Sequence, residues 1–266
     1  MKKVMVVKVG GSVLENLHPS FFDDCARKLG AEGTALVLVH GGGPFISQWM
    51  SQLGKKPTFI AGRRVTDEET LTIAEMTLAG QVNKELVSRL SRAGVAALGM
   101  SGVDLNLLQV EPEDPELGFV GKVTSIKAEA LQTILRQGWV PVIASLGIDE
   151  QGRIFNVNAD EAAAEIAQAL NAEQLVMVSD VDGVYIGDTL LSDVNPAMIE
   201  TYIAQGEITG GMIPKVRSAV RSLQGTVKEV RIASGKKAGV FDPASGTRIW
   251  KEEVDEHVAL PHIRTS

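Results

Sequence analysis

The chain has 266 residues, of which 44% are hydrophobic and 22% are charged. This composition is typical of a folded globular protein and excludes a largely disordered chain. Lys and Arg together number 26, and Asp and Glu number 33, which gives a net charge of −7. Because nucleic acids and anionic membranes are bound through basic surfaces, neither is an expected partner. An anionic ligand would have to be held by a few well-placed cations and backbone N–H groups.

Cys25 is the only cysteine, so neither an intramolecular disulfide nor an all-cysteine metal site can form. This usage fits a reducing compartment. The apolar run at residues 4–7 is interrupted by Lys8 before it reaches the ~7 to 15 residues of a signal peptide. No segment approaches the ~20 apolar residues of a membrane span. The sequence therefore predicts a cytoplasmic protein without a membrane segment.

Short apolar, largely β-branched runs alternate along the chain with longer segments of helical periodicity. The predicted strands are 4–9, 35–39, 95–100, 140–144, 175–178 and 227–233. The predicted helices are 19–32, 45–53, 67–93, 126–137, 159–170, 196–205 and 212–223. Strands that are apolar on both faces are typical of a parallel sheet covered by helices on both sides. The pattern predicts an α/β sandwich with a mainly parallel central sheet.

Boundary signals refine this prediction. Thr66, before Asp67, is a predicted helix N-cap, and Asn195 is another because proline follows it. The segment 109–123 is rich in Glu, Pro and Gly and has no clear period, which predicts a hairpin or another excursion outside the central layer. A boundary near residues 170–174 precedes a new strand and divides the chain in two.

Glycines cluster where predicted strands end and where a late helix begins. The clusters contain Gly10 and Gly11, Gly41 to Gly43, and Gly210 and Gly211. At such places backbone N–H groups and helix N-termini can approach a phosphate closely, although a tight turn also uses glycine. Neither G-x-x-x-x-G-K-[ST] nor G-x-G-x-x-G occurs, so no P-loop or dinucleotide fingerprint is present. Together the clusters indicate a phosphate cradle.

Two lysines lie beside these clusters. Lys8 belongs to an otherwise apolar strand, where a buried and unpaired ammonium would cost several kcal/mol, so it is expected to face an anion. Lys215 follows Gly211 by four residues, in the first turn of a predicted helix. A lysine there opposes the helix dipole, which favours a ligand-facing role over that of a solvated surface lysine.

Other polar residues are candidates for binding. Asn156, Asn158 and Asp160 alternate along an extended segment and share one face, although they also suit helix capping. Arg64, after Arg63, offers a planar fork for a carboxylate, or belongs to an exposed arginine pair. His40 is expected to be structural. The segment 179–183 lacks the third Asp or Asn and the distal Glu of a calcium loop, and the sequence predicts no metal held by dedicated protein ligands.

Seven motifs carry a family resemblance. They are Lys8-Val9-Gly10-Gly11-Ser12, His40-Gly41-Gly42-Gly43-Pro44, Gly62-Arg63-Arg64-Val65-Thr66, Val82-Asn83-Lys84, Asn156-Val157-Asn158-Ala159-Asp160, Ser179-Asp180-Val181-Asp182-Gly183-Val184 and Ile208-Thr209-Gly210-Gly211-Met212-Ile213-Pro214-Lys215-Val216. In this order and spacing, over about residues 3 to 250, the chain resembles the amino acid kinase family, and within it the kinases that act on N-acetylglutamate.

The resemblance implies an open αβα sandwich with two lobes. Residues 1–172 would bind the acyl amino acid and form the dimer contact, and residues 173–266 would bind ATP together with Mg²⁺. The implied reaction transfers the γ-phosphoryl group of ATP to the γ-carboxylate of N-acetyl-L-glutamate, a step of arginine biosynthesis. The family pattern further implies a homodimer paired through the region 67–93, with little inhibition by arginine. Whether a nitrogen-signalling protein binds is left open.

The resemblance also implies roles for individual residues. In the catalytic set, Lys8 and Lys215 stabilise the transferring phosphoryl group and Asp160 orients both lysines. The phosphate cradle consists of the backbone amides of Gly10, Gly11, Gly42 and Gly43. The substrate set consists of Gly42, Gly43, Arg64, Asn156 and Asn158. The nucleotide set consists of Asp180, Gly183, Tyr185, Thr209 and Gly211.

The residue types fit this chemistry. A γ-carboxylate is already ionised at neutral pH, so its attack on ATP needs no general base. Phosphoryl transfer then depends mainly on positioning and on charge stabilisation, which lysines and backbone N–H groups supply. This accounts for a site without a catalytic histidine.

Some positions depart from the family pattern. Val103 and Leu105 stand where the family frequently has lysine and glycine, and Ser234 stands before Gly235 where Asn or Asp is common. Two other functions remain as alternatives. One is a kinase acting on aminoadipate or glutamate attached to a carrier protein, and the other is a catalytically inactive sensor on the same fold.

Overall fold

The computed structural model describes residues 3–30, 33–223 and 227–251. Within these ranges, an eight-stranded sheet with the order β14-β16-β15-β11-β1-β2-β8-β5 forms the middle layer. Its strands are β1 (Val4–Val9), β2 (Ala35–His40), β5 (Ala97–Ser101), β8 (Val140–Ala144), β11 (Gln174–Ser179), β14 (Asp193–Val194), β15 (Glu229–Ser234) and β16 (Thr247–Trp250). Neighbours are parallel except β15 and β16. The predicted α/β sandwich is confirmed, although β14 and β16 were not predicted.

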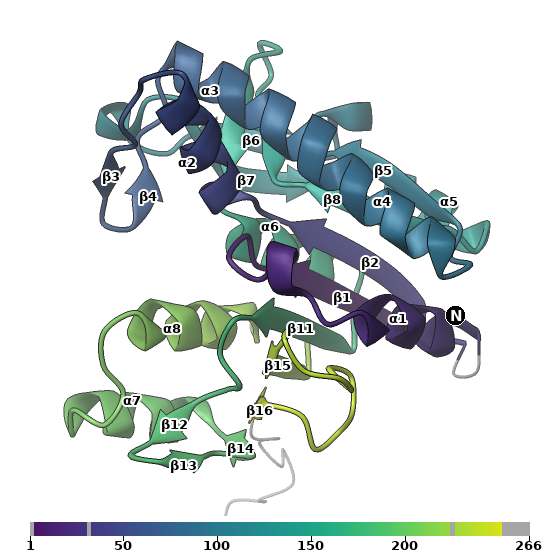
Figure 1. Ribbon diagram of the computed structural model, residues 1–266, viewed down its shortest axis with the longest axis vertical. Coiled ribbons are helices and arrows are strands. Elements are labelled where there is room, and N and C mark those ends of the chain that lie inside the picture. Colours follow the sequence, from purple (N-terminus) through teal and green to yellow (C-terminus); the bar gives the residue numbers. More distant parts are fainter. Residues whose placement is uncertain (1–2, 31–32, 224–226, 252–266) are drawn as a thin grey trace, which may run out of the picture.

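Helices cover both faces of this sheet (Figure 1). Those that match predicted helices are α1 (Ser20–Gly30), α2 (Gly43–Gln52), α5 (Ala128–Arg136), α6 (Ala159–Ala169), α7 (Pro196–Ala204) and α8 (Met212–Ser222). The end predicted for the first helix, at residues 31–32, lies outside the described residues. The long helix predicted at 67–93 forms as α3 (Glu68–Glu75), a π-helical segment (Met76–Val82) and α4 (Asn83–Arg92) in direct succession. None of the helices in the described ranges combines the length and apolar character that a membrane crossing requires.

One predicted helix cap is confirmed and one is wrong. Asn195 caps α7, and its side chain accepts a hydrogen bond from the N–H of Met198 at 2.8 Å. The cap of α3 is Asp67 rather than Thr66, because the Asp67 side chain accepts the N–H of Thr70 at 2.7 Å. The backbone of Thr66 is extended in a bridge to Gly118, so its hydroxyl cannot take the capping position. That hydroxyl donates to the carbonyl of Arg64 instead.

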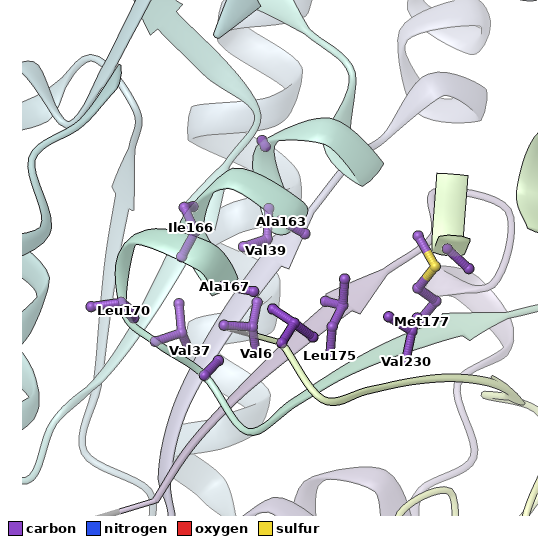
Figure 2. Packing of buried hydrophobic residues seen from close by; sticks show 14 of the residues in the cluster. Val6, Val37, Val39, Ala163, Ile166, Ala167, Leu170, Leu175, Met177 and Val230 are labelled. Atoms are coloured by element: carbon purple, nitrogen blue, oxygen red, sulfur yellow. The ribbon is translucent and has the colours of Figure 1, made fainter. Parts of the chain in front are cut away.

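Alternation along β1 decides which side chains meet which helices. Val4 and Val6 belong to the apolar cluster under α6, whereas Met5, Val7 and Val9 belong to the cluster under α1 and α4. Figure 2 shows the first cluster, in which α6 packs on β1, β2 and β11 through Val6, Val37, Val39, Ala163, Ile166, Ala167, Leu170 and Leu175. Each of the valine, isoleucine and leucine side chains contributes about 1.5 to 3 kcal/mol when fully buried. The same alternation turns Lys8 toward the α6 side.

A small closed barrel stands beside the main sheet. Its strands are β6 (Leu108–Pro112), β7 (Val120–Ile126), β9 (Leu146–Ile148) and β10 (Ile154–Val157). The hairpin predicted at 109–123 is confirmed, because β6 and β7 pair in antiparallel fashion. The strands β9 and β10 were not predicted. Two-residue strands also form the hairpins β3 (Phe59–Ile60) with β4 (Arg63–Arg64) and β12 (Tyr185–Ile186) with β13 (Thr189–Leu190).

The elements beyond residue 172 gather below β1 in Figure 1, and α2, α3, α4 and α5 lie above it. The main sheet nevertheless continues across the boundary predicted near residues 170–174, because β11 pairs with β1. The division into an acceptor-binding lobe and a nucleotide-binding lobe therefore stays a prediction.

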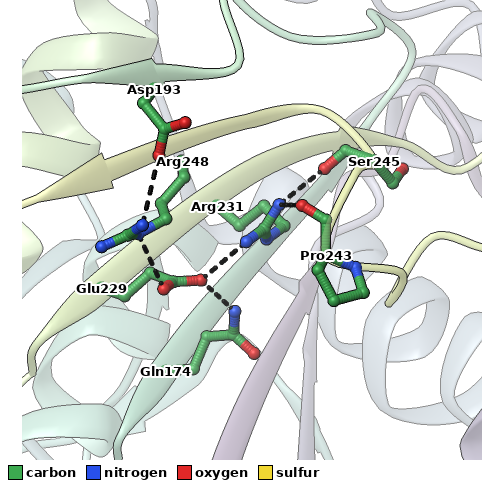
Figure 3. Close-up of polar contacts among 7 residues, drawn as sticks. All are labelled: Gln174, Asp193, Glu229, Arg231, Pro243, Ser245 and Arg248. Carbon is green, nitrogen blue, oxygen red and sulfur yellow. Dashed lines mark hydrogen bonds and ion pairs between the residues drawn. The ribbon is translucent and has the colours of Figure 1, made fainter.

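A polar network fixes the far edge of the sheet (Figure 3). The buried Arg231 donates to the carbonyls of Pro243 at 2.6 Å and Ser245 at 3.0 Å, and pairs with Glu229 at 3.0 Å. Arg248 lies 3.1 Å from the same glutamate. Two carbonyls of the loop between β15 and β16 are thus held by one buried guanidinium, which fixes the end of that loop against the sheet.

Leu105 gives a stability prediction. It has a left-handed backbone with φ of 58° and is 61% exposed. This conformation costs a non-glycine residue about 1 to 2 kcal/mol, whereas glycine loses about 0.5 to 1 kcal/mol through unfolded-state entropy. We expect Leu105→Gly to raise the free energy of unfolding by about 0.5 to 1 kcal/mol, measured by urea denaturation.

The matched control for this prediction is Leu53→Gly. Leu53 is equally exposed, at 60%, but has a φ of −88° that leucine adopts without strain. Its replacement is expected to lower stability by about 0.5 to 1 kcal/mol. A similar loss in both variants would show that the left-handed backbone at residue 105 carries no strain.

Candidate active site

A cavity of about 370 Å³ opens at the carboxyl ends of β1 and β2 and the start of α6. Several predicted site residues line it together, namely Lys8, Gly11, Gly42, Gly43, Arg64, Asn156, Asn158 and Asp160. Ligands of open parallel sheets bind in this kind of place, outside the carboxyl ends of the strands. Gly10 differs from its prediction, because its N–H donates to the carbonyl of Val178 at 2.9 Å and so serves the backbone of the fold.

Lys8 and Asp160 form an ion pair in this cavity, with Nζ 2.8 Å from Oδ1. The Lys8 side chain is 15% exposed, so its charge is largely removed from bulk water. Asn158 is the N-cap of α6, and its Oδ1 accepts the N–H of Asp160 at 2.8 Å and of Glu161 at 3.3 Å. The cap thus fixes the first turn of α6, which carries the carboxylate that faces Lys8.

Lys215 lies in the first turn of α8 and is held by the end of β11. Its Nζ donates to Ser179 Oγ at 2.7 Å, and the Ser179 hydroxyl donates to Asp180 Oδ1 at 3.1 Å. Its Nζ also lies 3.8 Å from Asp180 Oδ1. Burial lowers the pKa of Lys215, and the negative charge of Asp180 opposes that change. Asp160 was predicted to orient both lysines. It forms an ion pair with Lys8, whereas Lys215 contacts Ser179 and Asp180.

Ser179 is a residue that the sequence analysis missed. It lay inside a recognised motif, but its hydroxyl meets Lys215 only because α8 packs on β15, the strand next to β11. Burial pushes the pKa of the neighbouring Asp180 upward, but hydrogen bonds from its own N–H and from Ser179, with the charge of Lys215, leave that pKa below its usual range. Asp180 is therefore ionised at neutral pH.

Two glycine loops meet directly at this site. A Cβ on Gly11 would lie 2.9 Å from the backbone nitrogen of Gly43 and 3.1 Å from the Cα of Gly42. Atoms at such distances would force the loop after β1 away from the loop after β2. Glycine at position 11 therefore allows the backbones of both loops to border one cavity.

His40 and Asn83 support the second loop from behind. The geometry fits a neutral imidazole whose Nδ1–H donates to the carbonyl of Gly41 at 3.0 Å and whose Nε2 accepts from Asn83 Nδ2 at 3.1 Å. Burial lowers the pKa of His40 to about 4. Asn83 also donates to the carbonyl of Val142 at 2.8 Å. His40 is fully buried at the end of β2, which agrees with a structural role.

Arg64 is buried rather than exposed, with 7% of its surface accessible. Its Nη2 donates to the carbonyl of Gly43 at 2.8 Å and to Ser47 Oγ at 2.7 Å, and its guanidinium lies 4.8 Å from the centre of the Phe59 ring. Burial lowers the pKa of Arg64, but arginine stays protonated at any physiological pH. Such a fixed fork suits a carboxylate. Asn156 lines the same cavity and donates to Thr66 Oγ1 at 3.3 Å.

A second cavity, of about 570 Å³, is lined in part by Asp180, the carboxylate that lies 3.8 Å from Lys215. Four predicted nucleotide residues line it, namely Asp180, Gly183, Tyr185 and Thr209. Gly211, the fifth, precedes α8 as its N-cap residue. One wall is tied to the loop after β15, because Lys237 Nζ lies 2.7 Å from Asp182 Oδ2. Across the described ranges, no group of three His, Cys, Asp or Glu side chains is placed to hold a metal.

Comparisons with known proteins identify relatives of this chain. An acetylglutamate kinase from Geobacillus kaustophilus (strain HTA426) is 44% identical over 254 residues, which cover 95% of this chain and 98% of the relative. The crystal structure of smu.665 from Streptococcus mutans UA159 superposes with a TM-score of 0.83 at 31% identity, covering 94% of this chain and 99% of that one.

A further solved structure is N-acetylglutamate synthase from Neisseria gonorrhoeae complexed with coenzyme A and N-acetyl-glutamate. It superposes with a TM-score of 0.82 at 28% identity and covers 94% of this chain and 60% of that one. The model of the amino acid kinase family matches residues 3–234, which include Lys8, Lys215 and the residues that line both cavities. The chain therefore belongs to the amino acid kinase family.

Proposed function

We propose that this chain transfers the γ-phosphoryl group of ATP to the γ-carboxylate of N-acetyl-L-glutamate, giving N-acetylglutamyl 5-phosphate and ADP, as in arginine biosynthesis. One observation carries the proposal. A single cavity joins a buried arginine fork, Arg64, to a lysine that faces a carboxylate, Lys8, across a floor of glycine backbone. The Geobacillus relative named acetylglutamate kinase supports the same acceptor.

The acceptor lies in the first cavity, within residues 1–172. Arg64 binds its α-carboxylate, because a buried guanidinium is a strong and geometrically selective partner for that group. Asn156 and Asn158 contact the acetamido end and the main chain of the acceptor. This leaves the γ-carboxylate beside Lys8 and the loop at Gly42 and Gly43.

The nucleotide lies in the second cavity, within residues 173–266, and its phosphates extend toward Lys215. Mg²⁺ accompanies ATP and neutralises charge on the phosphate oxygens. Lys8 lies near the end of β1, and Lys215 on α8 is hydrogen-bonded to Ser179 at the end of the neighbouring strand β11. Besides burial, the charge of Lys8 lowers the pKa of Lys215, which agrees with two ammonium groups that lie near each other. The two lysines thus flank the space between acceptor and nucleotide.

The transfer itself needs no proton movement. An oxygen of the ionised γ-carboxylate forms a bond to the γ-phosphorus of ATP while the bond from that phosphorus to the β–γ bridging oxygen breaks. ADP leaves with that electron pair. Lys8, Lys215 and the N–H groups of the glycine loops stabilise the negative charge on the transferring group, which is how phosphoryl transfer is accelerated.

The experiment that tests this proposal traps the acyl phosphate with hydroxylamine. ATP-dependent hydroxamate formation is measured with N-acetylglutamate, glutamate, aspartate and N-acetylaspartate. Signal with N-acetylglutamate and none with the other three is expected. No signal with any of them, from folded protein that binds ATP, would overturn the proposal in favour of a carrier-protein-bound acceptor or an inactive sensor.

Gly11→Ala tests the contact between the two glycine loops. The added Cβ displaces the loop at Gly42 and Gly43, and a shift of about 1 Å at a reacting centre costs roughly 100-fold in rate. We expect kcat to fall about 10- to 100-fold in the hydroxamate assay. Gly30→Ala is the control, because among the described residues no atom beyond the chain neighbours and the backbone of its own helix lies within 4 Å of a Cβ there. Equal kcat values for the two variants would contradict the role of this contact.

We also propose a cytoplasmic homodimer paired through α3, the π-helical segment and α4. Met76 is exposed on that segment, and Leu98 is exposed on β5, the edge strand of the sheet. An unpartnered edge strand beside apolar side chains is a surface that association covers. Light scattering is expected to give twice the chain mass, and Met76→Glu is expected to give the single mass. A monomeric wild-type protein would exclude this arrangement.

A further inference from the structure

Arg63, beside Arg64 on the β3–β4 hairpin, contacts two carboxylates on other parts of the chain. Its Nη1 lies 2.9 Å from Glu113 Oε2, and its Nη2 donates to Glu161 Oε1. Glu113 directly follows β6, and Glu161 lies in the first turn of α6. One guanidinium therefore connects the hairpin with two elements that are distant in sequence.

These contacts span the acceptor cavity. Phe59 and Arg64 line it from the hairpin, and Asn158 and Asp160 line it from the start of α6. Arg63, which also lines the cavity, reaches from the first group to the second through Glu161. The ion pair of Arg63 with Glu161 thus connects two walls of the cavity in which the acceptor would lie.

Besides Arg63, Arg64 attaches the hairpin to the rest of the chain through its bonds to Gly43 and Ser47, but the hairpin contributes little apolar packing. Its strands are two residues each, and both Phe59 and Ile60 are exposed, so the hairpin buries little apolar surface. A two-stranded hairpin of this size is not stable by itself. Its position therefore depends on side-chain contacts such as those of Arg63, whose side chain is 24% exposed.

The Arg63–Glu113 contact is well shielded. Arg63 Nη1 and Glu113 Oε2 are both buried, and neither has a hydrogen-bond partner among the described residues. Each atom thus depends on the charge of the other, and loss of one partner leaves the other buried and uncompensated. Burial raises the pKa of Glu113, while the charge of Arg63 opposes that change.

We propose that Arg63 is a positioning residue that latches the β3–β4 hairpin to Glu113 and Glu161 and so holds Arg64 in place for the acceptor carboxylate. The inference rests on the proposed function, since it assigns the carboxylate of the acceptor to Arg64. Arg63 acts through the hairpin and does not touch the reacting atoms. Its loss therefore weakens acceptor binding more than it slows the transfer at saturation.

Arg63→Gln removes the charge and keeps a side chain of similar polarity. The KM for N-acetylglutamate is expected to rise about 10-fold or more, with kcat and the KM for ATP within about threefold of the wild-type values. Arg63→Lys keeps the charge but lacks the planar guanidinium. Its KM for N-acetylglutamate is expected to lie between those of the wild type and Arg63→Gln. Arg63→Gln combined with Glu161→Gln is expected to raise KM no further than Arg63→Gln alone, because the two residues share one contact.

Arg153→Gln is the matched control. Arg153 lies in the same lobe and pairs with Asp149 at 2.7 Å, but it does not line the cavity. Its kinetic constants are expected to match those of the wild type. An Arg63→Gln variant with unchanged KM, or one with a lowered kcat and melting temperature at unchanged KM, would overturn the latch and leave Arg63 a merely structural residue.

A second readout keeps this test separate from that of the proposed function. Amide hydrogen exchange of residues 59–64 is measured in Arg63→Gln and Arg153→Gln without substrates. Faster exchange in the hairpin of the first variant alone is expected. If the wild-type protein does not phosphorylate N-acetylglutamate, the proposed function fails, and the exchange result still decides whether Arg63 holds the hairpin.

Discussion

Lys8→Ala is expected to lower kcat about 100- to 1,000-fold while the protein stays folded, measured by the hydroxamate assay together with circular dichroism. The side chain of Lys8 is 15% exposed, and its Nζ lies 2.8 Å from Asp160 Oδ1. Charge stabilisation in so shielded a place is much stronger than in water. The alanine substitution removes the positive charge that stabilises the transferring phosphoryl group. It leaves the negative charge of Asp160 near that group.

The reason to expect an intact fold is that Lys8 stands at the end of β1, beyond the apolar contacts of Val4 and Val6. Lys3→Ala is the control, because Lys3 also carries an ion pair, to Glu173, but is largely exposed and distant from the cavity. Its kcat is expected to be unchanged. Turnover by Lys8→Ala within about tenfold of the wild type would remove Lys8 from the catalytic set.

The central layer could be predicted from the sequence because its signal is local. Six apolar runs, each long enough to form a strand, correspond to β1, β2, β5, β8, β11 and β15. Burial on both faces of the inner strands β1, β2, β8, β11 and β15 requires such runs, so the physical cause is visible in the residues themselves. The barrel strands β9 and β10 carry three and four residues and include Gly147 and Asn156, so no comparable period marks them.

Parts of the site depended on contacts that no local pattern encodes. The ion pair of Lys8 with Asp160 follows from the direction of one side chain on β1 and the start of α6, and both positions were predicted. Ser179, on the strand β11 beside β1, was missed as the partner of Lys215, because that contact depends on the packing of α8 against β15 and α6. The N–H of Gly10 was predicted to face phosphate, but its partner is Val178 on that same neighbouring strand.

Arg64→Lys is expected to raise the KM for N-acetylglutamate about 100-fold while kcat at saturation changes little. Lysine keeps the positive charge, so the variant tests the planar fork rather than the charge. In the wild-type protein, Gly43 and Ser47 occupy Nη2 and fix the plane of the guanidinium. Nη1 donates one N–H to Met50 Sδ at 3.3 Å, so its second N–H and that of Nε are left for the carboxylate. A lysine ammonium cannot reproduce that geometry.

Ser47→Ala tests how much the orientation of the Arg64 guanidinium contributes, because Arg64 itself is retained. This change removes one of the two hydrogen bonds that Nη2 donates and leaves the bond to Gly43, so the KM for N-acetylglutamate is expected to rise only a few-fold. The KM for ATP is expected to be unchanged in both variants, because Arg64 lines the first cavity and not the second. An Arg64→Lys variant whose KM for N-acetylglutamate stays within threefold of the wild type would show that the acceptor carboxylate is bound elsewhere.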